Sequence, residues 1–123
     1  MREKWYIKIW TSKRYIDFWS TNHTLSGCNL AAIFFFTKTS LLISVIATLA
    51  ILIAWEFFEF SHGVKEVIQN RISDVVVGMI GFFVTHYLML SNVFNNTIFF
   101  VIIFLADSFL GAWGFWAYKR AKK

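Results

Sequence analysis

The sequence predicts an all-α fold, a bundle of four transmembrane helices in one integral membrane domain over residues 1–123. Three observations indicate this. The chain is 58% hydrophobic and only 15% charged, with a mean hydropathy of +0.58, which is unusually apolar for a soluble domain of this size. Four stretches are long enough to cross about 30 Å of hydrocarbon. Proline is absent, so that each stretch can continue as an unbroken helix.

The first two predicted spans are residues 18–36 and 41–60. The first contains no acid, Lys or Arg, and the second contains no charge until Glu56 and Glu59 near its end. A helix needs roughly 20 apolar residues to cross a bilayer, and both stretches have that length.

The third and fourth predicted spans are residues 72–90 and 97–118. Asp74 lies at the start of the third span and Asp107 near the middle of the fourth. Only short turns and two tails are left outside the four spans, which excludes a separate soluble catalytic domain.

Between the second and third spans, the sequence predicts a short interfacial helix. Gly63 can end the preceding span, and Val64, Val67 and Ile68 then recur at positions i, i+3 and i+4. We expect this segment to be structural.

The distribution of basic residues predicts the orientation. Of the twelve Lys and Arg residues, all but Lys38 fall in the two tails or between the second and third spans. Short basic segments stay in the cytoplasm, so both termini are predicted to be cytoplasmic. All six Trp residues fall on the same side, as expected for indole rings at a membrane interface.

The N-terminal tail is predicted to be an interfacial amphipathic segment. Its basic residues alternate with Trp5, Tyr6, Ile7, Ile9 and Trp10. Such a segment binds anionic lipid headgroups, so the expected partners are membrane lipids and not nucleic acid.

Five polar side chains converge on the cytoplasmic leaflet in this topology. Glu56, Glu59, Asp74 and His23 are candidate catalytic residues, and Arg71 is the candidate substrate-binding residue. Ionisable groups inside a membrane are costly and mark functional sites. The set could bind a phosphate or headgroup, relay protons or bind a divalent cation. The structural alternative is that Glu59 or Asp74 only pairs with Arg71 at the interface.

No metal or cofactor is expected. Glu56, Glu59 and His62 form the E-x-x-E-x-x-H spacing of di-iron bundles, but the chain has no second Glu-x-x-His. The single Cys28 cannot form an internal disulfide, and we expect it to be a packing residue.

Spans three and four share the pattern D-x-x-x-G-x-x-G-F. In a helix, the acid and both glycines of this pattern lie on one stripe, and glycines let two backbones approach closely. We therefore expect these two helices to pack against each other through their glycines. The helix-packing residues are Gly78, Gly81, Gly111 and Gly114.

Two further polar residues lie within the spans, Asp107 and His86. A charge near the bilayer centre costs roughly 2.5–3.5 kcal/mol, so Asp107 should face the bundle interior. We expect Thr85, His86 or a neighbouring subunit to satisfy it.

The arrangement resembles the VanZ-like group of small bacterial membrane proteins. In that group, an early helix carries a His, a middle helix ends in an acid with a polar residue three positions later, and an Arg and a D-x-x-x-N-x-x-G helix follow. The similar residues are His23 with Gly27, Glu56 with Glu59, Arg71, and Asp74 with Gly81. The chain departs from the group at Glu59, where Gln is usual, and at Gly78, where Asn is usual. The resemblance implies a bacterial inner-membrane protein with a role in the cell envelope.

The leading functional hypothesis is a protein whose inner-leaflet pocket recognises or modifies an envelope lipid or lipid-linked headgroup. The sequence does not decide whether the protein is an enzyme. One alternative is a phage holin or superinfection-immunity protein that acts by oligomerising. Another is an accessory subunit of a larger membrane complex.

Overall fold

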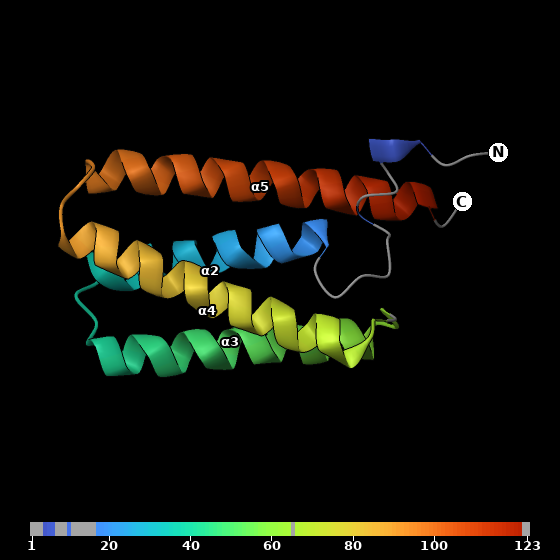
Figure 1. Cartoon of the computed structure of the whole chain (residues 1–123), viewed down its shortest axis with the longest axis horizontal. Coiled ribbons are helices and arrows are strands. Elements are labelled where there is room, and N and C mark those ends of the chain that lie inside the picture. Colours follow the sequence, from blue (N-terminus) through green and yellow to red (C-terminus); the bar gives the residue numbers. More distant parts are fainter. Residues whose placement is uncertain (1–3, 7–9, 11–16, 65, 122–123) are drawn as a thin grey trace.

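The computed structural model describes residues 4–6, 10, 17–64 and 66–121, and this part of the chain contains long helices and no strand. The helices are α2 (Phe18–Phe36), α3 (Leu41–Ser61), α4 (Ile68–Leu90) and α5 (Asn96–Ala121). They run alternately up and down, so the start of α2, the end of α3, the start of α4 and the end of α5 lie at one end of the bundle (Figure 1). The predicted all-α helical bundle is confirmed.

Local sequence signals define the helix ends. Asp17 caps α2 in a reciprocal capping box, in which its carboxylate accepts the Ser20 backbone N–H and the Ser20 hydroxyl accepts the Asp17 N–H. Ser40 caps α3 by accepting the Ile43 backbone N–H. Gly63 follows α3 with φ of 78°, a conformation that costs glycine little, and it ends the helix as predicted.

The predicted short interfacial helix is wrong. Val64, Glu66 and Val67 lie in a non-helical connection, and Ile68 is instead the first residue of α4. A stretch of a few residues is too short to form a helix by itself, because nucleation is unfavourable. The Val64 carbonyl, which is outside any helix, accepts a hydrogen bond from Arg71.

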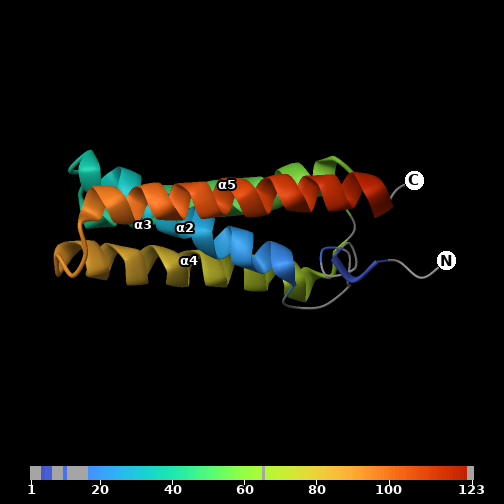
Figure 2. The same ribbon diagram turned by 90° about the horizontal axis from the view of Figure 1, so that it is seen from above.

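Helix α2 is the central element, because it packs against α3, α4 and α5. It runs obliquely across the other helices (Figure 2). Its closest approach is to α4, where a Cβ atom on Gly27 would overlap the backbone carbonyl of Gly78, and one on Gly81 would overlap the Thr24 carbonyl. Glycine is therefore required where α2 and α4 cross.

The glycine stripes of α4 and α5 do not face each other, contrary to the sequence expectation. Both stripes pack against α2: Gly78 and Gly81 lie beside His23 and Thr24, whereas Gly114 lies beside Trp19. The sequence pattern identified glycines at close contacts but not their partner. Small residues permit close approach without specifying which helix approaches.

The bundle has polar side chains inside and large apolar side chains outside. Helix α3 buries a single stripe whose members are Ser44, Thr48, Leu52 and Glu56. The rest of α3 exposes Leu, Ile and Phe side chains. Helices α3, α4 and α5 are each long and apolar enough to cross a membrane. This chain is an integral membrane protein, since such surfaces are stable only against lipid.

Helix α2 is not among the helices that are long and apolar enough to cross a membrane, and its polar side chains are covered by protein. Ser20, His23 and Asn29 are all buried within the bundle. A helix surrounded by other helices can carry polar groups that lipid would not tolerate.

An aromatic cluster covers the end of the bundle at which α2 begins. Trp10 is only 3% exposed and contacts the rings of Phe18, Trp19 and Trp113. Trp5 is 70% exposed, and Tyr6 stacks on Trp116. The other residues of the predicted interfacial segment (1–3, 7–9 and 11–16) lie outside the described residues.

Candidate functional site

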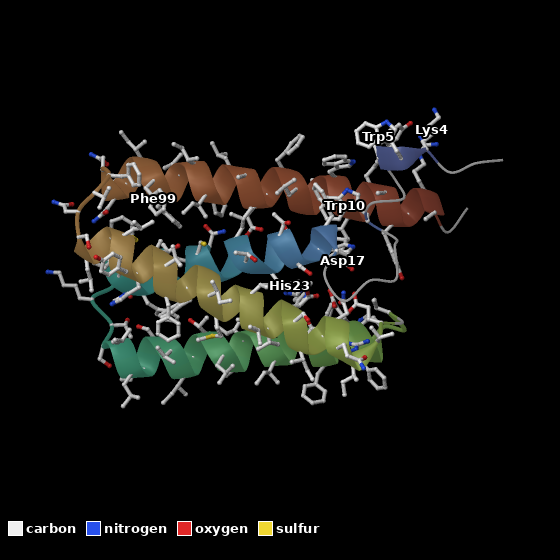
Figure 3. All side chains as sticks on the ribbon, viewed as in Figure 1. Lys4, Trp5, Trp10, Asp17, His23 and Phe99 are labelled. Carbon is white, nitrogen blue, oxygen red and sulfur yellow. The ribbon has the colours of Figure 1, made fainter. Side chains whose placement is uncertain are left out.

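A polar cluster lies inside the bundle near the end where α2 and α4 begin. His23 comes from α2, Glu56 from α3, and Arg71 and Asp74 from α4. His23, Glu56 and Asp74 are 5%, 7% and 0% exposed. Figure 3 shows His23 projecting from α2 toward α4. The helix packing therefore brings together four of the five residues that the sequence placed in one leaflet.

The carboxylates of the cluster surround the His23 imidazole. The His23 Nε2 atom lies 3.4 Å from Asp74 Oδ2 and 3.7 Å from Glu56 Oε1. The other Asp74 oxygen, Oδ1, accepts a short 2.6 Å hydrogen bond from the Ser20 hydroxyl. Asp74 Oδ2 and both Glu56 oxygens are buried and have no hydrogen-bond partner among the described residues. The cluster is therefore crowded with acceptors and short of donors.

Arg71 does not neutralise the cluster through direct hydrogen bonds. Its Nη1 donates to the backbone carbonyl of Glu56 at 2.9 Å, and its Nη2 donates to that of Val64 at 2.8 Å. The closest carboxylate oxygen among the described residues is Glu56 Oε2, at 3.7 Å. The expected ion pair with Glu59 or Asp74 is replaced by this looser contact, because the two carbonyls hold the guanidinium beside the connection.

Two further acids lie beside Glu56. Glu59 accepts a hydrogen bond from the Trp55 indole N–H at 2.8 Å, and an oxygen of Glu66 lies within 4.8 Å of both Glu56 and Glu59. Burial raises the pKa of Glu66 to about 7, with smaller contributions from Asp74 and Asp17. Sequence reasoning missed Glu66, although its place in a short connection beside Arg71 was a usable signal.

His62, the last residue of the E-x-x-E-x-x-H pattern, does not join the cluster. Its Nδ1 lies 2.8 Å from the Phe58 carbonyl, and its side chain is exposed. His62 follows the last residue of α3, so it belongs to the helix end and not to the buried stripe. The pattern therefore does not form a metal site as a unit.

Asp107 lies in a separate polar region between α2 and α5. Its Oδ2 accepts hydrogen bonds from the Asn29 amide at 2.7 Å and the Ser26 hydroxyl at 3.3 Å. With its amide nitrogen directed at Asp107, Asn22 donates to Oδ1 at 2.8 Å. The expectation that Thr85 or His86 satisfies Asp107 is wrong, because α2 lies next to α5 and supplies these donors.

His86 lies apart from both polar regions. Its ring contacts Phe35 and stacks on Phe82 at 6.1 Å between centroids. These contacts make His86 part of an aromatic packing group.

A groove of about 910 Å³ opens beside the cluster, between α3 and α4. Glu56, Glu66 and Arg71 line its polar part, at the end near the connection between the two helices. The apolar part is lined by Ile53, Phe57, Phe60, Ile72, Val75 and Val76. The groove therefore combines a charged end with a long apolar wall.

Sequence reasoning also missed the polar residues that position the cluster. Ser20 holds Asp74, and Asn70 donates from its amide to the Asp17 carboxylate at 3.2 Å. The usable signal was the run of polar residues in the first half of span 18–36, which is too polar for a helix facing lipid.

The chain matches no protein-family model, no curated protein and no solved structure. Its function is therefore inferred from the chemistry of the cluster and the shape of the groove.

Proposed function

We propose that this membrane protein recognises the phosphorylated headgroup of an envelope lipid or lipid-linked intermediate in the groove between α3 and α4. The acyl or prenyl chain lies along the apolar wall, and the phosphate lies beside Arg71. The polar end of the groove lies in the cytoplasmic leaflet, in accordance with the predicted orientation.

The observation that supports this proposal best is the combination of Arg71 with the apolar groove. Two of the five guanidinium N–H groups donate to the carbonyls of Glu56 and Val64, which fix the plane of the side chain. The Arg71 side chain remains 15% exposed, and it lines the groove. A fixed guanidinium binds phosphate well, because its planar donors match the phosphate oxygens.

The apolar wall selects an amphiphile over a soluble phosphate. Phe57 and Phe60 of α3 are 70% and 69% exposed and face Ile72 of α4 across the groove. An acyl chain lying between them removes this apolar surface from contact with bulk lipid and positions the headgroup near Arg71.

The test is native mass spectrometry of the purified full chain in detergent. The probes are phosphatidic acid, diacylglycerol with the same acyl chains, and inorganic phosphate. We expect retention of phosphatidic acid alone, because binding needs both the charge and the chain. Arg71→Gln should weaken this binding about tenfold, since it removes a charged hydrogen-bond donor.

Arg120→Gln is the matched control, because Arg120 is an exposed cation at the same end of the bundle but outside the groove. This variant should bind phosphatidic acid as the wild type does. Equal retention of diacylglycerol, or an equal loss in Arg120→Gln, would contradict a phosphate site at Arg71.

The cellular role that we propose is in the bacterial inner membrane and its envelope. The VanZ-like resemblance supports this role, because its motif residues His23, Glu56, Arg71 and Asp74 lie in one cluster. A passive pore former such as a holin needs no buried cluster of this kind. Whether the bound lipid is also modified depends on the acids beside it.

A further inference from the structure

Three side chains with metal-binding atoms meet at one point in the bundle. His23, Glu56 and Asp74 come from three different helices, and each offers one ligand atom within 4.8 Å of the other two. All three are more than nine-tenths buried. The sequence separations of these residues match no short metal motif, so that only the packing of α2 against α3 and α4 brings them together.

The carboxylates in this cluster lack the hydrogen-bond partners that burial normally requires. Both Glu56 oxygens and Asp74 Oδ2 have no hydrogen-bond partner among the described residues, although they are inaccessible to solvent. Buried charges are normally paired or bound to metal ions. Arg71 supplies one positive charge near two carboxylates, and its hydrogen bonds within the described part of the chain go to backbone carbonyls. The cluster thus offers buried acceptor oxygens that a cation would occupy.

The two distances from the His23 imidazole are close to those between ligands around one ion. Ligands at about 2.0–2.1 Å from a tetrahedral ion lie roughly 3.3 Å from each other. The His23 Nε2 atom is 3.4 Å from Asp74 Oδ2 and 3.7 Å from Glu56 Oε1. Small side-chain movements would therefore complete the coordination without any movement of the helices.

Ser20 orients Asp74 for this role. Its hydroxyl donates to Asp74 Oδ1 at 2.6 Å and leaves Oδ2 directed at His23. Hydrogen bonds of this kind, from a neighbouring residue to a ligating carboxylate, are typical of metal sites.

We propose that His23, Glu56 and Asp74 bind one divalent first-row transition-metal ion, such as Zn²⁺ or Mn²⁺. An imidazole nitrogen combined with two carboxylates suits these ions, whereas Ca²⁺ and Mg²⁺ prefer oxygen ligands alone. Three protein ligands leave at least one coordination position for water or a ligand oxygen. This site differs from the Glu59–His62 pattern, and its existence does not depend on lipid binding.

The test uses the purified full chain in detergent, stripped with chelator and then incubated with Zn²⁺ or Mn²⁺. After removal of free ion, elemental analysis should find about one ion per wild-type chain. In the Mn²⁺-loaded protein, pulsed electron paramagnetic resonance should detect a coordinated imidazole nitrogen, and His23→Gln should abolish that signal.

Glu56→Gln and Asp74→Asn should each weaken ion binding at least tenfold. Asp107→Asn is the matched control, because Asp107 is also an intramembrane carboxylate but lies with α2 amides outside the cluster. Arg71→Gln should keep or tighten the ion while losing phosphatidic acid, which separates this proposal from the lipid site.

Several outcomes would overturn the site. They are no bound ion in the wild type, a bound ion without nitrogen coordination, or an equal loss of the ion in Asp107→Asn. Size-exclusion chromatography and circular dichroism show which variants are folded. If a ligand variant does not fold, the nitrogen signal of the wild type still decides the question.

Discussion

The two polar regions of the bundle both contain carboxylates, but among the described residues only one region supplies every carboxylate oxygen with a hydrogen-bond donor. Around Asp107, side-chain amides and a hydroxyl of α2 donate to both carboxylate oxygens. Around His23, the oxygens of Glu56 and one oxygen of Asp74 are left without donors. Both regions depend on α2, and a pocket of about 260 Å³ between α2, α3 and α5 is lined by both His23 and Asp107.

This difference indicates separate roles. A buried carboxylate whose oxygens both accept hydrogen bonds holds two helices together and does not need a ligand to satisfy it. A buried carboxylate without donors destabilises the empty protein and is retained where a ligand uses it. Under the proposals above, the Asp107 region serves structure and the His23 cluster serves ligand binding.

We expect the largest loss of stability from a substitution that displaces α2 and so disrupts both polar regions. In Gly27→Ala, the added methyl group would overlap the Gly78 carbonyl, and α2 would be displaced from α4. We expect a destabilisation of about 3 kcal/mol or more, because the obstacle is backbone that cannot move aside. Thermal unfolding in detergent, followed by Trp fluorescence, measures it.

Gly111→Ala is the control for this substitution. Its nearest neighbour is the end of the Asn22 side-chain amide at 3.4 Å, which a small adjustment accommodates. The variant should unfold close to the wild-type temperature. An equal fall in the unfolding temperature of both variants would show that the α2–α4 crossing is not the critical contact.

The next largest loss of stability is expected at Asp107, whose carboxylate oxygens both accept hydrogen bonds. Asp107→Asn removes the charge that accepts hydrogen bonds from Asn29 and Ser26, and it places an amide opposite other donors. Hydrogen bonds to charged groups contribute roughly 1.5–3 kcal/mol, so stability should fall by about 2 kcal/mol. The same unfolding assay measures this, and ion and lipid binding should persist.

Glu56, whose oxygens accept no hydrogen bond among the described residues, should respond with the opposite sign. Glu56→Gln removes a buried charge that has no hydrogen-bond donor, so the ion-free protein should gain about 1 kcal/mol of stability while ion binding is lost. Unfolding in the presence of chelator measures the gain. A loss as large as that of Asp107→Asn would contradict the contrast between the two regions.

The smallest effect concerns Asp17, which lies outside the spans. Burial raises the pKa of Asp17, although hydrogen bonds from Ser20 and Asn70 oppose the shift. The folded state therefore holds the proton more tightly than the unfolded state, and this contribution to stability is lost as pH rises through the raised pKa. Asp17→Asn retains a cap without the charge, so it should gain stability relative to the wild type as pH rises. Unfolding temperatures from pH 4 to 7 measure the difference, and parallel curves for both proteins would contradict it.

Much of the helical architecture was predictable from local pattern. The spans 18–36 and 41–60 agree with α2 and α3 to within one residue at each end, and α4 only begins earlier than expected. Apolar length and capping residues act within one segment, so they can be identified without knowing the fold. The same reasoning predicted that four polar residues lie at one depth in the membrane, namely His23, Glu56, Arg71 and Asp74.

The partners of these residues were not predictable. The glycines of α4 and α5 contact α2, and Asp107 is satisfied by Asn29 instead of Thr85 or His86. Depth along the membrane normal follows from sequence, but the order of helices around the bundle does not, because glycine and polar residues can serve any neighbour.

The sequence by itself determined an apolar helical membrane chain, the ends of most helices and the position of each ionisable group along its helix. These follow from interactions with lipid and with nearby backbone. Only the tertiary structure decided that α2 occupies the centre, that the amides of α2 satisfy Asp107, and that His23, Glu56 and Asp74 meet. These outcomes depend on which helix faces approach each other, and contacts between distant segments settle that choice.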